Sequence, residues 1–200
     1  ALLDDLDKNA DDSVNAYTLN LSETSYTAAD LNTLNGLTSV PINASAVTTL
    51  TGAAGDIVTT LVENSDLDSN LTGASPRTIT GLDDVAVTID PDASTATIEQ
   101  INKMERLTTG LITATVTAGG VNQGLDHLID STSGIGLTNP NNAISVTVND
   151  GGDTDQIITA ADLLTLNSRT TGLITVSVST ITGSVADLKT AFAANDATAT

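Results

Sequence analysis

Three acidic loops carry the residues that could do chemistry in this chain. Asp and Asn side chains recur in each loop at close spacing, and hard cations such as calcium bind through several oxygens of this kind. The candidate ligands are Asp150, Asp153 and Asp155 in "NDGGDTDQ", Asp90 and Asp92 in "DPD", and Asp5, Asp7, Asn9 and Asp11 in "DDLDKNADD". The glycine at the sixth position and the closing glutamate of a helix–loop–helix calcium site are missing. The loops therefore predict calcium as a ligand, with solvated acidic turns as the alternative.

The remaining reactive residue types do not form a catalytic pattern. The chain has no cysteine and a single histidine, His127, and no serine lies in a G-x-S-x-G turn. A lone histidine without a nucleophile or an orienting acid is not a catalytic site. The glycine turn at Gly183 lacks the Gly-Lys-Ser/Thr of a phosphate-binding loop. We therefore expect no enzymatic activity.

Charge and composition limit the classes of partner. The chain has 25 Asp and Glu against 6 Lys and Arg, and its net charge is −19. With no basic surface to neutralise phosphates, we expect no nucleic-acid binding. No apolar run reaches the length of about 18 residues that a membrane-spanning helix needs, so we expect no membrane insertion. Aromatic residues make up only 2% of the chain, so Leu, Ile, Val and Ala must fill the core.

The sequence segments around these loops contain internal repeats. The stretch "TTGLIT" begins at Thr108 and again at Thr170, and "TAADL" begins at Thr27 and again at Thr159. "GLTSVPINA" in the first third aligns with "RLTTGLITA" in the middle, so the chain holds three copies. The predicted division is the end of a preceding repeat and a linker at 1–15, repeat 1 at 16–76, repeat 2 at 77–140 and repeat 3 at 141–200.

Each repeat predicts a strand, a helix, a second strand and a second helix. Three of the helix starts place Thr or Ser three residues before Asp, which is typical of an N-cap hydroxyl and an acid in the first turn. The expected strands are 16–22, 40–47, 85–90, 111–117, 143–149 and 173–179. The expected helices are 27–37, 53–64, 95–107, 121–130, 159–169 and 184–195.

The strands alternate apolar and hydroxyl residues. Ile112, Ala114 and Val116 fall on one face and the intervening threonines on the other, as Ile174 and Val176 do in repeat 3. Strands joined through helices should be parallel, with right-handed crossovers. The sequence predicts an α/β right-handed solenoid, in which one parallel sheet is covered by helices on one face and exposes a Thr/Ser-rich face on the other. A compact two-layer α/β domain and a β-only solenoid are the alternatives.

The two ends of the chain fall in the middle of a repeat. Solenoid ends expose apolar surface unless they are capped, and neither end carries a recognisable cap. The expected partners are therefore copies of the chain itself or adjacent repeats, stacked end to end. Repeat 1 has Val40 where the others have Gly110 and Gly172, which predicts a local departure at that junction.

The segments from Thr27 to Ile57 and from Thr170 to Ala193 resemble a known group of repeats. The motifs "ADLNTLN", "VTTLTG" and "SVADLKTAF" are similar to those of the giant cell-surface and secreted proteins of marine picocyanobacteria, including the protein associated with non-flagellar swimming. Repeat 2 departs from this pattern with "TIEQINKM", so a related bacterial surface repeat is an alternative. The resemblance implies an extracellular structural role and assigns no catalytic residue.

The expected function is that of a structural repeat in an extracellular filament, surface layer or giant surface protein. The alternative is an adhesin-type binding module that uses the hydroxyl face or the acidic loops to contact a glycan, a mineral or a calcium-dependent surface. Regular Thr-x-Thr rows on a flat sheet could also order water, as in ice-binding proteins. Thr is equally the usual solvent-facing strand residue, because it is β-branched yet polar.

Overall fold

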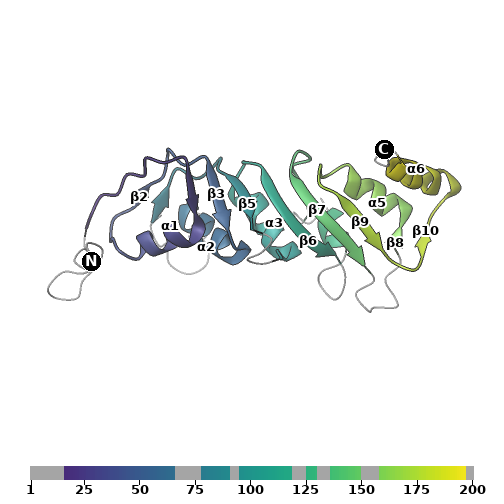
Figure 1. The fold of residues 1–200 in the computed structure, drawn as a ribbon, viewed down its shortest axis with the longest axis horizontal. Coiled ribbons are helices and arrows are strands. Elements are labelled where there is room, and N and C mark those ends of the chain that lie inside the picture. Colours follow the sequence, from purple (N-terminus) through teal and green to yellow (C-terminus); the bar gives the residue numbers. More distant parts are fainter. Residues whose placement is uncertain are drawn as a thin grey trace. The chain divides into compact units, whose positions relative to one another are not determined.

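The structure, a computed structural model, describes residues 16–65, 78–90, 95–118, 125–129, 136–149 and 158–196. It is a mixed α/β fold with a mostly parallel central sheet and helices (Figure 1). The chain divides into two compact units. The first comprises Ala1–Ser94 with Arg106–Ile112, and the second comprises Thr95–Glu105 with Thr113–Thr200.

The first unit alternates strands and helices along the chain. Strands β1, β3 and β5 pair in parallel in that order, and β2 and β4 form a separate parallel pair. Helix α1 contacts β1 and β3, while α2 contacts β3 and β5. The elements are β1 (Ser25–Thr27), α1 (Ala28–Asn35), β2 (Ile42–Asn43), β3 (Thr49–Gly52), α2 (Ala54–Asn64), β4 (Ile79–Thr80) and β5 (Ala86–Ile89).

The second unit repeats this alternation. Strands β6, β7 and β9 pair in parallel in that order, and β8 pairs in parallel with β10. Helix α5 contacts α4 and α6. The elements that lie wholly or mostly in this unit are α3 (Ile98–Leu107), β6 (Ile112–Ala118), α4 (Asp126–Ile129), β7 (Ala143–Asn149), β8 (Ile158–Thr159), α5 (Ala160–Asn167), β9 (Ile174–Ser177), β10 (Ile181–Thr182) and α6 (Val185–Asp196). We call one sheet strand with the helix that follows it a βα module.

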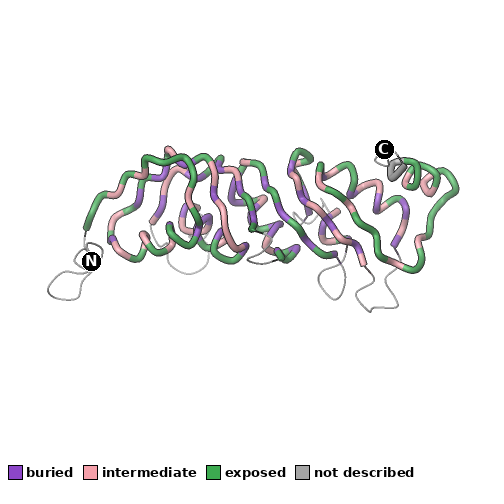
Figure 2. The backbone as a smooth tube through the Cα atoms, viewed as in Figure 1, coloured by how far each residue is buried: buried purple, intermediate pink, exposed green. Residues whose placement is uncertain are grey.

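Alternating burial confirms the two-faced strands that the sequence predicts (Figure 2). In β6 every second residue, beginning with Ile112, is buried and the threonines between them are exposed. In β7, Ile144, Val146 and Val148 are buried, while the intervening residues are only partly covered. Apolar residues of the helices are buried as well, including Leu31, Ile57, Leu61, Ile101, Met104 and Leu166. The described core therefore consists of Leu, Ile, Val, Ala and Met, as the shortage of aromatics predicts.

The N-terminal part of the sheet differs from the prediction. The expected strand at 16–22 forms only an isolated bridge from Asn20 to Asn43, and the regular strand β1 begins later, at Ser25. The reason lies in the neighbouring strand, which is only two residues long. Pro41 has no N–H for a ladder, and Asn43 Oδ1 accepts the N–H of Ser45 in a side-chain turn that ends β2.

The expected strand at 40–47 is also wrong in its extent. A turn closed by the bond from Val47 N–H to the Ala44 carbonyl, 2.9 Å long, divides it. The chain forms β2 before this turn and β3 after it. Val176, predicted to lie on the covered face of β9, is 39% exposed, because β9 stands at the end of its sheet.

The predicted helix caps are confirmed. The Thr27 hydroxyl accepts the Asp30 N–H at 3.1 Å, and the Thr159 hydroxyl does the same for Asp162. The Ser184 hydroxyl accepts the Asp187 N–H. Helix α3 begins with a reciprocal capping box. In it, Gln100 N–H donates to the Thr97 hydroxyl and Thr97 N–H donates to Gln100 Oε1.

Removing one cap should lower stability by a measurable amount. We expect Thr159→Ala to cost about 1 kcal/mol of unfolding free energy, because the Asp162 N–H loses its acceptor. The matched control is Thr165→Ala in the same helix, whose hydroxyl bonds only to the Ala161 carbonyl. That change should leave stability within about 0.5 kcal/mol of the wild type. Urea unfolding of both variants checks this, and equal effects would contradict a capping role.

Candidate functional site

The acidic loops lie mostly outside the described residues. Asp5, Asp7, Asn9, Asp11, Asp92, Asp150, Asp153 and Asp155 all belong to segments that the structure does not describe. Asp90 is described, is exposed and donates its backbone N–H to the Gly52 carbonyl at 3.0 Å. Among the described residues no group of three or more His, Asp or Glu side chains could hold a metal ion. Calcium at these loops stays a prediction.

Calcium binding has a direct test in calorimetry. If the loops hold structural calcium, millimolar calcium should raise the melting temperature of the chain above its value in chelator, because a ligand that binds only the folded state stabilises it. Magnesium at the same concentration is the control for simple screening of the −19 charge. A melting temperature that is the same in calcium and in chelator would contradict the prediction that the loops hold structural calcium.

His127 lies on the short helix α4. Its Nε2 atom is 3.9 Å from Asp126 Oδ2, and the Asp126 side chain is largely exposed. The backbone carbonyl of His127 accepts a hydrogen bond from Asn102 Nδ2 at 3.1 Å.

The hydroxyl face forms rows across neighbouring strands. In the second unit the register places Thr117 beside Thr147 and Thr147 beside Thr175. In the first unit it places Thr27 beside Thr51 and Thr51 beside Thr88. The first-unit row is interrupted chemically, because the Thr27 hydroxyl is used in the cap of α1. The second-unit row is the better candidate for a contact surface.

A different set of threonines is buried and forms hydrogen bonds with distant backbone groups. Thr38, Thr108 and Thr170 occupy the same place in the three repeats, just before the junction into the second strand, and all three are buried. Each hydroxyl donates to a backbone carbonyl more than twenty residues earlier. The acceptors are Tyr17 O at 2.6 Å, Val85 O at 2.8 Å and, for Thr170, either Ile144 O at 2.8 Å or Asn142 O at 2.9 Å.

The same hydroxyls also accept backbone N–H groups. Thr108 accepts the Gly110 N–H and Thr170 accepts the Gly172 N–H, both at 3.0 Å. Thr170 accepts in addition the Ile144 N–H at 3.0 Å. One side chain therefore satisfies polar groups of its own turn and of an earlier module, where unpaired buried groups would be costly. We call this arrangement the threonine junction.

The glycines of the junction are required by close approach. A Cβ on Gly110 would lie 2.1 Å from the Val85 carbonyl oxygen, and one on Gly172 would lie 2.2 Å from the Ile144 carbonyl. Both contacts are with backbone, which cannot rotate away. The two "TTGLIT" copies thus combine a buried threonine with a glycine that lets the earlier strand come near.

Repeat 1 shows the local departure that Val40 predicts. The bond from the Val40 N–H to the Thr38 hydroxyl is 3.3 Å long, against 3.0 Å at the two glycine junctions. The carbonyl acceptor of Thr38 belongs to Tyr17, which lies outside any regular strand. In repeat 3 the acceptor Ile144 is part of β7.

A second repeated contact joins successive helices. Asn32 of α1 donates from Nδ2 to the Asp56 carbonyl of α2 at 3.1 Å, and its Oδ1 accepts the Thr60 hydroxyl at 2.8 Å. Asn102 of α3, at the equivalent position, donates to the His127 carbonyl of α4. Among the described residues Asn102 Oδ1 has no partner, although the side chain is buried. The repeats therefore share this contact between helices as well as their sequence motifs.

Comparison with protein-family models, curated proteins and solved structures gave no match. The class that the fold defines is a mixed α/β protein with a mostly parallel sheet. None of the helices in the described ranges is long and apolar enough to span a membrane.

Proposed function

We propose that this chain is a structural segment of an extracellular filament, surface layer or giant surface protein, built from α/β repeats that stack as a right-handed solenoid. The observation that carries the proposal is the threonine junction. It recurs at Thr38, Thr108 and Thr170, and each copy bonds the turn after a helix to backbone more than twenty residues earlier, which for Thr108 and Thr170 lies at the start of the preceding sheet strand. A chain that reuses its inter-module contact in this way is suited to adding length by repetition.

Sheet order supports the solenoid. Within each unit the sheet strands follow one another in chain order, β1-β3-β5 and β6-β7-β9, and neighbouring strands in these two series pair in parallel. Right-handed crossovers that always add the next strand on the same side place their helices on one face of the sheet. The alternating burial of β6 fits a sheet that is covered on one face.

The extracellular location rests on the resemblance of the repeat motifs to bacterial surface and secreted proteins. The strongly acidic composition is compatible with it, since a net charge of −19 keeps such arrays soluble in salt water, where screening shortens the repulsion between them.

Electron microscopy of native material tests the structural role. In negative stain, material isolated from cells that make the chain should show extended arrays or layers with a regular repeat. Isolated compact particles that carry the chain would overturn the proposal. Labelling with an antibody to the chain identifies the particles.

A binding module is the second candidate, and the hydroxyl row Thr117–Thr147–Thr175 favours it. An adhesin would use this flat polar surface to contact a glycan or a mineral. The discriminating variant is Thr117→Lys with Thr175→Lys, two exposed positions of the row. Binding of the wild type to a glycan array that these changes abolish would favour the adhesin, and the absence of any binding would favour the purely structural role.

A further inference from the structure

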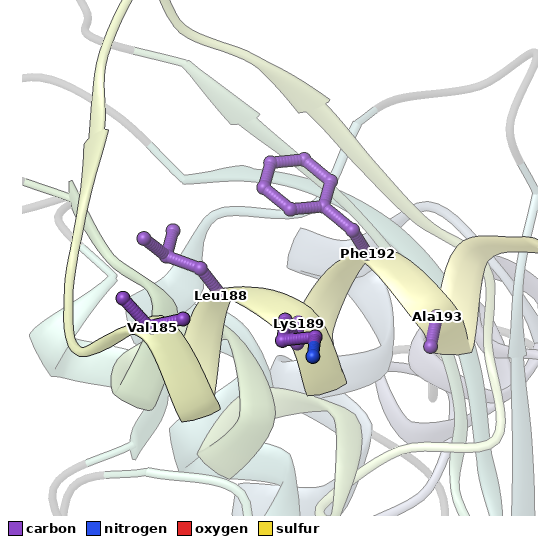
Figure 3. A pocket seen from close by; sticks show the side chains of 5 residues that line it. All are labelled: Val185, Leu188, Lys189, Phe192 and Ala193. Carbon is purple, nitrogen blue, oxygen red and sulfur yellow. The ribbon is translucent and has the colours of Figure 1, made fainter.

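An open hollow lies on the surface of α6 (Figure 3). It is lined by Val185, Leu188, Lys189, Phe192 and Ala193, so the Lys189 ammonium is the one polar side-chain group in its lining. Such a surface does not select one class of ligand, and the structure does not show what covers it. A pair of asparagines in repeat 1 is chemically more specific.

Asn20 and Asn43 lie side by side at the surface of repeat 1. They form an isolated parallel bridge, and Asn43 Nδ2 donates to Asn20 Oδ1 at 3.0 Å. Both residues are exposed. Each is also the first residue of an Asn-x-Ser motif, in "NLS" and "NAS". An exposed motif of this kind in a secreted chain is an acceptor for N-linked glycosylation.

Repeat 3 has a pair of threonines at the equivalent place. Counted from the carbonyl that accepts the junction threonine, Asn20 matches Thr147, and counted from the junction threonine itself, Asn43 matches Thr175. The two threonines are partners in register, as the two asparagines are. Repeats 2 and 3 contain no Asn-x-Ser or Asn-x-Thr motif. Repeat 1 therefore differs from its copies by having amides at both members of a cross-strand pair, and both amides begin an acceptor motif.

The two amides differ in the bonds that they already make. Asn43 Nδ2 donates to Asn20, and Asn43 Oδ1 accepts the Ser45 N–H at 3.1 Å, so both ends of this side chain are engaged. Among the described residues, the Asn20 side chain bonds through its oxygen only. The Ser22 hydroxyl that completes the motif belongs to an exposed residue as well. Asn20 is therefore the more accessible acceptor of the two.

We propose that Asn20 is a site of N-linked glycosylation, an inference that rests on the proposed function because the acceptor motif is used in exported chains. The sugar donor is a lipid-linked oligosaccharide diphosphate. Asn20 Nδ2 forms a bond to the anomeric carbon of the first sugar, and the bond from that carbon to the diphosphate oxygen breaks. The lipid diphosphate leaves with the electron pair, and the amide proton passes to a base of the transferase. Asn20 Oδ1 is unchanged and still accepts the bond from Asn43.

The modification would set repeat 1 apart from its copies. Glycans are bulky and solubilising and stay at the surface. A glycan on Asn20 would occupy the place where repeat 3 presents Thr147 and Thr175. Contacts made by bare hydroxyl rows would then be confined to the later repeats.

Mass spectrometry of the chain isolated from the outer surface of the cells that make it tests the site. Trypsin, followed by a protease specific for glutamate, separates the three motifs of repeat 1 into the peptides 9–23, 24–63 and 64–77. The peptide 9–23 should carry additional mass made of whole sugar residues. Electron-transfer fragmentation should place these sugars on Asn20.

Two variants made in the same cells show whether the motif directs the modification. Ser22→Ala keeps Asn20 but removes the hydroxyl of the motif, so the glycosylated fraction of this peptide should fall to background. The matched control Thr18→Ala removes another exposed hydroxyl of the same peptide and should leave that fraction unchanged. An unmodified peptide 9–23 from surface-exposed protein, or sugar that survives Ser22→Ala, would overturn the inference and leave the structural proposal standing. Chain found only inside the cells would overturn both.

Discussion

Replacing Gly110 with alanine is expected to lower the free energy of unfolding by about 3 kcal/mol, near the upper end of what over-packing costs. The added Cβ would lie 2.1 Å from the Val85 carbonyl oxygen and 2.4 Å from its carbon. The same carbonyl accepts the buried Thr108 hydroxyl at 2.8 Å. A shift that relieves the clash must therefore also stretch this hydrogen bond, so that two losses follow from one methyl group.

The control for this variant is Gly36→Ala in the same unit. Gly36 follows α1 with φ −72°, which any residue adopts, and a Cβ there would lie 3.4 Å from the Thr33 carbonyl, in ordinary contact. We expect its unfolding free energy to remain within about 0.5 kcal/mol of the wild type. Urea unfolding followed by circular dichroism measures both. Equal midpoints for the two variants would show that close approach at Gly110 is not a constraint.

Local signals account for the part of the fold that the sequence predicts well. A hydroxyl three residues before an acid marks the start of α1, α5 and α6, and the structure has those caps. Strict alternation marks β6 and β7, and both have one buried face. These features depend on neighbours in the chain, so their evidence is contained in short windows of sequence.

The short ladders β2–β4 and β8–β10 escaped prediction for the opposite reason. Each strand has two residues, which is too few to show a period of two. Pairing at Ile42–Asn43 with Ile79–Thr80 comes from a distant part of the chain. The predicted strand at 16–22 is wrong for a different reason. Tyr17, Leu19 and Leu21 alternate with polar residues as they would in a strand, but the partner strand β2 beside them is too short to extend a ladder.

The candidate functional residues also include some that the sequence predicts and some that it does not. The acidic loops were found from residue type alone, and the one described member, Asp90, has no cluster of acids around it among the described residues. The threonine junction was missed, because Thr reads as a solvent-facing strand residue. A signal was available. The threonine is kept in "LTSVPIN" of repeat 1 as Thr38, where the glycine is lost, which marks the hydroxyl as the more constant feature.

Thr170→Val is the sharpest test of that hydroxyl. Valine keeps the shape and the β-branch but removes the oxygen, which accepts the N–H groups of Ile144 and Gly172 and donates to the carbonyl of Ile144 or Asn142. The buried Ile144 N–H, one buried carbonyl and the partly buried Gly172 N–H would lose a partner. With a cost of about 1–3 kcal/mol for each unsatisfied buried group, partly relieved by relaxation, we expect a loss of about 3 kcal/mol.

Two further variants separate the hydroxyl from the volume of the side chain. Thr170→Ser keeps the oxygen and loses one methyl group, so it should cost only about 1 kcal/mol. Thr175→Val, on the exposed face of β9, should change stability by less than about 0.5 kcal/mol. Thr38→Val should be milder than Thr170→Val, because the Thr38 hydroxyl holds the Val40 N–H at 3.3 Å and has no counterpart of the Ile144 bond. If valine and serine at position 170 proved equally stable, the junction would depend on packing, and the proposed hydrogen-bonded link between modules would be wrong.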